Sequence, residues 1–411
     1  MLNKNQEREL SYVVLIDKIE PIEGSDNCEA AVVGGWKVLT RKGTFKRGDA
    51  AVYFEVDSKV DTSKKEFSFM ERYHGKIKTQ RYTFGGKNPG FYSQGLLMPA
   101  SDFGWTVEGN KIIDSNGVAH CAEDESRFLT KQLGVTYADA EDNKRKKNLN
   151  KYDLMLRRLG KKGSHWPIRW LAKSTLGKKI LFVFYGKKED KRGSWPSHIC
   201  SKTNVERVEN EPFWLENKEL LVASEKVDGS SCTFAAERGA FGRIKHYICS
   251  RNVVFENPDQ ANYYGDMIGK NIYYEAYVKY DIERIIDMIL KDYMLDNVAI
   301  QCEIYGNGVQ KRDYSLPDGE RRIAVFHIVS NRNRFTMDQV VEICERYGLP
   351  HVDIIDDEFV MPDTVEELRE YLDSAPSVID GKMKEGIVFY RKDNGNSFIK
   401  CVSPKYLLKY H

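Results

Sequence analysis

The sequence of 411 residues lacks several features that would place it in a specialised class. No apolar run approaches the roughly 18 residues needed to cross a bilayer. The first residues, Met1 to Arg8, lack the apolar stretch of a secretory signal. The eight cysteines are scattered, and no two of them form a CxxC pair. These absences argue against a membrane protein, a disulfide scaffold and a zinc site, and they favour a reducing, cytoplasmic compartment.

The chain also has little net charge, +2, so its overall charge predicts no polyanionic partner. The distribution of charge is uneven, because residues 144–192 hold 17 Lys or Arg against 3 Asp or Glu. Lysine and arginine interspersed with tryptophan and leucine are typical of a surface that binds a phosphate backbone. A solvated linker, a helix pair packed on a neighbouring domain, or a helix on a membrane surface would have the same composition.

Residues 10–100 alternate short apolar runs with glycine-rich turns. Strands are predicted at 12–16, 30–39, 51–56, 76–82 and 93–99, and five such strands favour a small closed barrel of the OB type. A barrel of this type binds oligonucleotides through one face, although it can equally serve for packing or for contacting a nucleotide site.

The C-terminal half alternates predicted strands with amphipathic helices, which indicates an α+β domain of antiparallel sheets flanked by helices. Helices are expected from Asp281, at 338–347 and at 365–372, and the acidic stretch 353–358 is expected in a loop. The predicted domains are an OB-fold domain at 1–125, a basic linker or helical insert at 126–200, and a catalytic domain at 201–411.

A lysine, an aspartate and a glycine meet in a turn between two apolar strands, in the segment Glu225-Lys226-Val227-Asp228-Gly229. A protonated lysine has no lone pair, so its use as a nucleophile requires a neighbour that favours the neutral amine. A hydrated divalent cation held by Asp228 would provide this. Gly229 is expected to allow a backbone conformation that other residues avoid. An ordinary hairpin with a surface salt bridge explains the segment by itself equally well.

Further motifs follow this segment in a fixed order along residues 200–411. They are Ser250-Arg251-Asn252, a strand from Gln301 to Gly306 that carries Glu303, an apolar strand through Phe326, the pair Glu385-Gly386, and a strand through Lys400 followed by Lys405. The ordered set resembles the covalent nucleotidyltransferases, a group that contains polynucleotide ligases and mRNA capping enzymes.

The domain order narrows this resemblance. In DNA ligases and capping enzymes an OB domain usually follows the catalytic domain, whereas Lys400 lies so near the end that we expect none to follow here. With the segment Thr203 to Arg207 and the segment Gly306 to Lys311, the chain resembles the ATP-dependent RNA ligases of the fifth family. Such enzymes join an N-terminal OB module to an adenylyltransferase (ATP-grasp-like ligase) domain. Thr203 and Glu206 would also suit a helix capping box.

The resemblance implies a reaction in three steps. Lys226 takes AMP from ATP as a covalent lysyl-AMP, the AMP passes to an RNA 5′-phosphate, and the RNA 3′-OH then displaces it. Asp228, Glu303 and Glu385 would hold the water shell of Mg²⁺ or Mn²⁺, with Glu303 also near the nucleotide.

The resemblance also implies a set of nucleotide contacts. The expected contacts are Glu225 on adenine, Phe326 stacked on the base, Arg251 on the ribose or the end phosphates, Lys400 on the α-phosphate, and Arg207 on the leaving triphosphate. Lys405 stands in for a second motif lysine, because Val402 occupies the position where relatives often carry one. Core packing or a structural ion pair would explain any one of these residues taken alone.

The expected partner is RNA with 3′-OH and 5′-phosphate ends, alone or in a duplex. The protein is expected to act as a monomer, and no membrane is expected as a partner. Three alternatives remain: a DNA ligase, a GTP-dependent capping enzyme, and a nucleic-acid-binding protein with an inactive transferase site.

Overall fold

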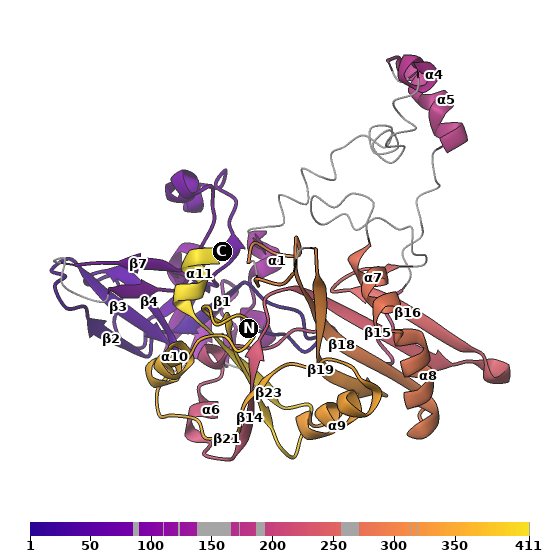
Figure 1. Ribbon diagram of the computed structural model, residues 1–411. Coiled ribbons are helices and arrows are strands. Elements are labelled where there is room, and N and C mark those ends of the chain that lie inside the picture. Colours follow the sequence, from indigo (N-terminus) through magenta and orange to yellow (C-terminus); the bar gives the residue numbers. More distant parts are fainter. Residues whose placement is uncertain are drawn as a thin grey trace. The chain divides into compact units, whose positions relative to one another are not determined.

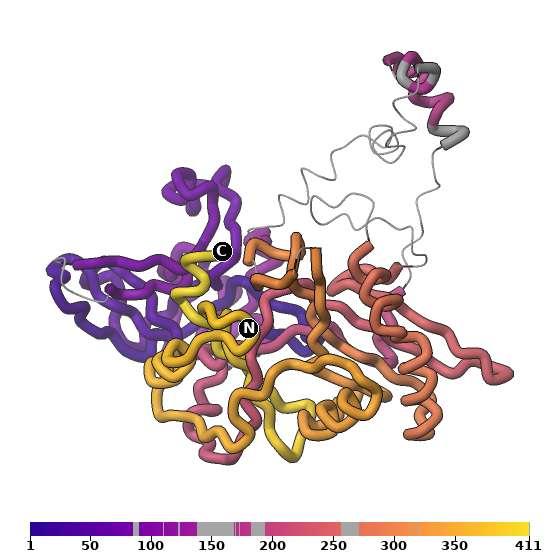
Figure 2. The backbone as a smooth tube through the Cα atoms, in the orientation of Figure 1, coloured from indigo at the N-terminus to yellow at the C-terminus, as the bar shows by residue number. Residues whose placement is uncertain are grey.

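The computed structural model describes residues 1–84, 90–109, 111–121, 124–137, 166–171, 173–185, 194–255, 271–312, 314–317 and 319–410. The chain forms two compact units (Figure 1). Unit 1 contains Met1–Asp139, Asn204–Val227 and Asp353–His411, and unit 2 contains Ala140–Thr203 and Asp228–Val352. By these bounds the chain passes between the units after Asp139, Thr203, Val227 and Val352, and both of its ends belong to unit 1 (Figure 2). The domain bounds expected from the sequence stay predictions.

The N-terminal part of unit 1 is a barrel built from short antiparallel strands, as expected. One sheet pairs β1 (Ser11–Leu15) with β5 (Ala50–Phe54) and β5 with β9 (Leu96–Pro99). Another contains β2 (Lys18–Pro21), β3 (Cys28–Val33) and β4 (Trp36–Arg41). The single strand predicted at 30–39 is two strands, because Gly34 takes a left-handed φ of 54° and turns the chain. Alternate residues of the strands fill two apolar clusters, which include Val52 and Phe54 on one side and Trp36 and Tyr53 on the other.

The segment that joins β5 to β9 carries extra elements. It contains β6 (Ser58–Lys59), the 3-10 helix η1 (Lys65–Tyr73), and a hairpin of β7 (Gln80–Tyr82) and β8 (Phe91–Ser93). After β9 come η2 (Ala100–Phe103), β10 (Thr106–Glu108), β11 (Lys111–Ile113), β12 (Ala119–His120), η3 (Glu125–Arg127), α1 (Thr130–Leu133) and β13 (Thr136–Tyr137).

The rest of unit 1 is a four-stranded antiparallel sheet in the order β21-β14-β22-β23. Its strands are β21 (Ile354–Phe359), β14 (Leu221–Lys226), β22 (Gly386–Arg391) and β23 (Phe398–Val402). The elements η4 (Val208–Asn210), α6 (Phe213–Glu216), α10 (Val365–Ser374) and α11 (Pro404–Tyr410) accompany it. The prediction of a loop at 353–358 was wrong, because most of this segment belongs to β21. This strand lies at the edge of its sheet, and its acidic residues Asp357 and Glu358 are exposed to water.

Unit 2 is built on a six-stranded antiparallel sheet in the order β17-β16-β15-β18-β19-β20. Its strands are β15 (Ser230–Arg238), β16 (Ile244–Ser250), β17 (Val254–Phe255), β18 (Asn297–Gly306), β19 (Arg321–Ser330) and β20 (Asn333–Arg334). Its helices are α4 (Trp166–Leu171), α5 (Thr175–Tyr185), α7 (Ile272–Lys279), α8 (Ile282–Asp292) and α9 (Met337–Tyr347), with η5 (Ala240–Gly242). The α+β class is therefore confirmed.

Local sequence explains the helices of this unit. Helix α8 begins one residue after Asp281, as predicted, and its isoleucines at positions 282, 285, 286 and 289 are buried. Helix α9 begins at a capping box formed by Thr336 and Gln339, and it ends at Gly348 with a left-handed φ of 71°.

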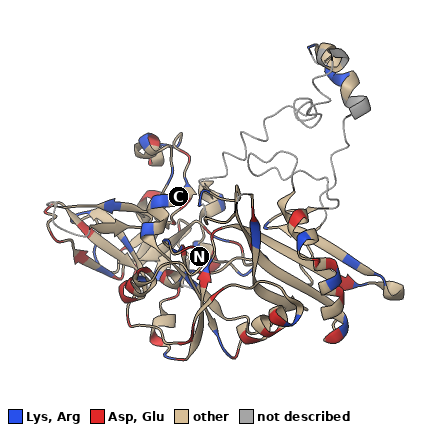
Figure 3. Ribbon diagram, viewed as in Figure 1, with Lys and Arg blue, Asp and Glu red and all other residues tan. Residues whose placement is uncertain are grey.

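Acidic and basic residues are interspersed along both units (Figure 3), in keeping with a net charge of +2. Most of the basic segment 144–192, including Lys144 to Lys147, lies outside the described residues, so its role stays a prediction. Within the described part of the chain, no helix has the length and apolar character that a bilayer span requires.

Candidate active site

The lysine singled out in the sequence lies in direct contact with one of the predicted metal-binding acids. Lys226 is the last residue of β14 and pairs with Gly386, so Glu385 stands just before the partner strand. Lys226 Nζ lies 2.7 Å from Glu385 Oε2, and the two side chains are 24% and 10% exposed. A side chain at Gly386 would meet the carbonyl oxygen of Cys401 at 2.3 Å, so a glycine is required for this strand packing. The register of the sheet thus joins two residues that are 159 positions apart.

Lys400 brings a second lysine to the same sheet, from the neighbouring strand β23. Burial lowers the pKa of Lys400 well below its ordinary value, and the nearby cations Arg8, Arg207 and Lys226 lower the pKa further. Glu385 acts in the opposite direction. Three cations and one acid act on this half-buried lysine, and an excess of cations suits a bound phosphate.

Arg207 is held against the barrel. Its guanidinium lies 5.5 Å from the ring centre of Trp36, and its Nη2 is 3.8 Å from Asp57 Oδ2. Nε and Nη1 of Arg207 are buried and have no hydrogen-bond partner among the described residues. The capping box that Thr203 and Glu206 suggested is absent, because residues 201–206 form no helix.

Two other residues that were predicted to contact the nucleotide bond to protein groups in this structure. The carboxylate of Glu225 is buried and accepts hydrogen bonds from the Ser377 hydroxyl and, at 2.8 Å, from the Val378 backbone N–H. Lys405, on α11, lies 3.0 Å from Asp373 on α10. This hydrogen bond raises the pKa of Lys405. Their roles toward a nucleotide stay predictions.

In unit 2, the turn after the lysine packs tightly on strand β18. A side chain added at Gly229 would meet the Ile304 carbonyl oxygen at 2.2 Å and the Glu303 Cγ at 2.9 Å. Gly229 is therefore required by this close approach, and its φ is not left-handed. The Asp228 backbone N–H donates to Tyr314 Oη at 2.6 Å, which fixes the turn.

Tyr314 holds the turn that follows Lys226, and the sequence analysis did not single it out. It is 1% exposed, and the guanidinium of the buried Arg312 lies 4.1 Å from its ring centre. No motif pointed to Tyr314, because its contact with Asp228 joins residues 86 positions apart.

The remaining predicted contacts of unit 2 lie on or beside its sheet. Phe326 is half-buried in β19, where the ladder to β18 shifts register between Gln301 and Cys302. A shift of this kind re-aims a side chain. Arg251 is exposed directly after β16.

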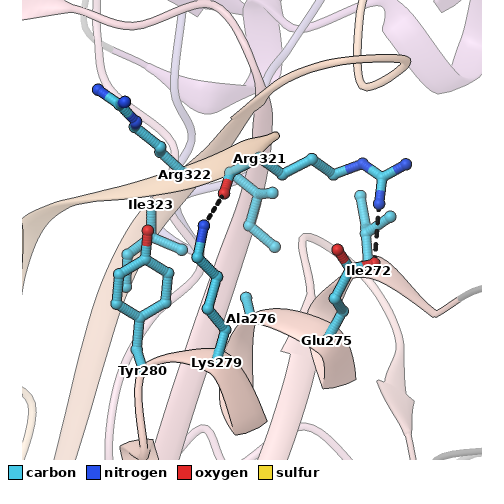
Figure 4. Close-up of a pocket in the computed structure, with 9 residues that line it drawn as sticks. Ile272, Glu275, Ala276, Lys279, Tyr280, Arg321, Arg322 and Ile323 are labelled. Atoms are coloured by element: carbon cyan, nitrogen blue, oxygen red, sulfur yellow. Dashed lines mark hydrogen bonds and ion pairs between the residues drawn. The ribbon is translucent and has the colours of Figure 1, made fainter. Parts of the chain in front are cut away.

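A small pocket of unit 2 lies away from these residues, between α7 and strands β18 and β19 (Figure 4). Lys279 Nζ donates to the Arg321 carbonyl oxygen at 2.7 Å, and Arg321 Nη1 lies 2.8 Å from Glu275 (Figure 4). Ile304 lines this pocket, and its neighbour Glu303 points to the opposite face of the strand. The pocket is therefore separate from the predicted metal acids.

The acids present suit a hydrated cation. Glu385 approaches Lys226 in unit 1, and in unit 2 the Asp228-Gly229 turn packs against Glu303. Over the described ranges, no three His, Cys, Asp or Glu side chains form a ready-made cage. Mg²⁺ and Mn²⁺ keep several waters and need few direct protein ligands, so carboxylates of this kind fit them.

Family models match both parts of the chain. The model described as RNA ligase matches residues 219–411, and a model described as an OB-fold domain matches residues 10–100. A comparison with curated proteins finds no match.

Solved structures of an RNA ligase from Naegleria gruberi share the fold. The structure with pyrophosphate has 22% identity, a TM-score of 0.66, and a match that covers 98% of this chain and 99% of that one. A variant solved with ATP and manganese has 22% identity, a TM-score of 0.67 and the same coverage.

Proposed function

We propose that this chain, in which an RNA ligase domain follows an OB-fold domain, is an ATP-dependent ligase that joins RNA 3′-OH and 5′-phosphate ends, including nicks in a duplex. The observation that carries the proposal is the contact of Lys226 Nζ with Glu385 at 2.7 Å, beside the half-buried Lys400. The acid would hold the protonated lysine in place until the nucleotide and a cation arrive.

The proposed chemistry balances over three steps. Lys226 Nζ loses a proton and attacks the α-phosphorus of ATP, and the bond from that phosphorus to the bridging oxygen breaks and releases pyrophosphate. A 5′-phosphate oxygen of RNA then displaces the lysine and forms a 5′–5′ pyrophosphate with AMP. The RNA 3′-OH loses a proton, attacks the 5′-phosphate, and releases AMP. Covalent catalysis divides one difficult condensation into steps with good leaving groups.

A divalent cation, Mg²⁺ or Mn²⁺, would stabilise negative charge on the phosphates and favour the neutral lysine. Asp228, Glu303 and Glu385 are proposed to hold its waters. Toward the nucleotide, Lys400 and Arg207 are proposed to bind phosphate oxygens.

The remaining nucleotide contacts stay with the residues expected from the sequence. Phe326 is proposed to stack on the base, Glu225 to read it, and Arg251 to contact the ribose or the end phosphates. Lys405 is proposed as the second lysine near the phosphates.

The hairpin of the barrel supports RNA as the partner. Tyr82 and Phe84 are stacked, with ring centres 6.4 Å apart and planes 16° apart. Arg81 stands opposite Tyr92 in the hairpin, and its side chain is exposed. Stacked aromatics with exposed cations suit a single strand, and the loop between the last two barrel strands is a common contact region of OB folds. The basic segment 144–192 is proposed to add phosphate contacts.

All eight cysteines are free thiols, which supports the proposed reducing, cytoplasmic compartment. A monomer is proposed.

The test is covalent labelling by ATP that carries its label on the α-phosphate, in the presence of Mg²⁺ or Mn²⁺. We expect the wild type to retain the label, Lys226→Ala to lose it, and Lys382→Ala, a change at an exposed lysine of the same unit, to keep it. Competition by unlabelled ATP, GTP and NAD would separate an RNA ligase from a capping enzyme or a DNA ligase. Sealing of nicked duplexes with RNA or DNA on each side then tests the ends.

An unlabelled wild type that still binds RNA would refute the proposal and favour an inactive binding protein.

A further inference from the structure

The barrel and the four-stranded sheet of unit 1 share a buried polar network. Glu55 directly follows barrel strand β5 and is 1% exposed. Arg8 Nη1 donates to Glu55 Oε2 at 3.0 Å. Asn210 Nδ2 donates to Glu55 Oε1 at 3.1 Å and to Glu206 Oε1 at 2.7 Å, while Asn210 Oδ1 accepts from Trp36 Nε1 at 2.6 Å. Asn210 therefore links two acids and the barrel core.

The same network reaches the strand that carries Lys400. The Lys400 backbone N–H donates to the Glu206 carbonyl oxygen at 2.9 Å, and Arg207 and Lys400 form a parallel bridge. Strand β23 stands at the edge of its sheet, with β22 on one side. The Glu206-Arg207 segment is therefore its neighbour on the other side, and the barrel side chains hold that segment.

The buried Glu55 has two cationic partners, the α-ammonium of Met1 and the guanidinium of Arg8. Burial by itself would raise the pKa of Glu55, but the α-ammonium of Met1 and the guanidinium of Arg8 outweigh burial and lower the pKa to about 2. A buried charge that loses its partner is costly, so the members of the network are held in one arrangement. A rigid support of this kind fixes the position of the strand that it contacts.

We propose that Glu55 and Asn210 are positioning residues, which fix the strand of Lys400 through Asn210 and Glu206. The inference rests on the proposed function, because it concerns the role of Lys400 on the α-phosphate.

The test compares Glu55→Gln and Asn210→Ala with Glu366→Gln as the matched control. Glu366 lies 2.8 Å from Lys37, so this pair also joins the barrel to the other part of unit 1, but it lies outside the network around Glu206. The first readout is hydrogen exchange of the backbone amides of β23, which needs no catalysis. The second readout is the rate of lysine adenylylation without RNA at saturating ATP.

We expect faster exchange at β23 and at least tenfold slower adenylylation in Glu55→Gln and Asn210→Ala, with RNA affinity within about twofold of the wild type. Glu366→Gln should change neither readout. Asn210→Ala leaves the Arg8–Glu55 pair in place, so it keeps the test decisive if Glu55→Gln fails to fold.

Unchanged exchange at β23, or unchanged adenylylation, in a folded Asn210→Ala protein would overturn the inference. A wild type without covalent adenylate would instead overturn the proposed function, while exchange at β23 would still report whether the network positions the strand.

Discussion

Replacing Glu385 by glutamine would remove one negative charge beside Lys226 and keep the shape of the side chain. In the structure, Glu385 Oε2 lies 2.7 Å from Lys226 Nζ, and the glutamate side chain is 10% exposed. The substitution would therefore disturb both the orientation of the amine and the carboxylate proposed to hold a hydrated cation. We expect Glu385→Gln to slow lysine adenylylation strongly while the protein stays folded.

The expected size follows from these two losses. A hydrogen bond to a charged group contributes about 1.5–3 kcal/mol, and a factor of ten in rate corresponds to about 1.4 kcal/mol. Loss of one such interaction in the transition state would slow adenylylation about tenfold or more, and loss of two would slow it about 100-fold or more. The concentration of Mg²⁺ or Mn²⁺ for half-maximal rate should also rise.

The assay is single-turnover transfer of labelled AMP to the protein over a series of metal concentrations. Glu358→Gln is the matched control, because Glu358 is an exposed acid on β21 of the same sheet. A Glu385→Gln protein with the wild-type rate and metal dependence would refute the metal-site assignment of this residue.

Three further predictions concern pH, packing and RNA. The pKa of Glu55 is lowered from 4.5 to about 2. Its contribution to the stability of the folded state is therefore present above pH 4.5 and is lost as the pH falls toward 2. In urea unfolding at a series of pH values, the free energy of unfolding should fall more steeply in this window for the wild type than for Glu55→Gln. Phe389→Ala, at a residue that is 0% exposed and 4.8 Å from Phe359 between ring centres, should lower the free energy of unfolding by about 3–5 kcal/mol in urea titrations. A loss below about 1 kcal/mol would contradict the packing argument. Tyr82→Ala should weaken binding of single-stranded RNA about fivefold or more in a titration at fixed salt. Phe213→Ala, at an aromatic residue that is 57% exposed, is the control for both substitutions, and equal RNA binding by Tyr82→Ala and Phe213→Ala would refute the hairpin's role.

Several elements could be predicted because their signals are local. Helix α8 was expected from the spacing of its isoleucines, and strand β14 from its apolar run, since each pattern reflects neighbouring residues on one element. The acidic residues of β21 suggested a loop, because an edge strand that faces water carries few of the apolar residues that identify strands. The break at Gly34 and Gly35 was missed for a related reason, since the residues on both sides of it are apolar.

The residues of the candidate site also differ in whether a local pattern in the sequence identifies them. Ordered motifs singled out Lys226, Glu385 and Lys400, and their roles stay predictions. No motif indicated the contact of Asp228 with Tyr314. A hydrogen bond between residues far apart in the chain depends on the register of strands and on packing between elements, and neither is written in any short segment.

The sequence by itself determined the barrel, the α+β class and the resemblance to RNA ligases, because these depend on local patterns and on motif order. Only the tertiary structure decided that Glu385 contacts Lys226 and that Asn210 connects Glu55 of the barrel to the segment beside Lys400. The physical reason is that a buried charge needs a partner, and folding alone brings that partner from a distant part of the chain.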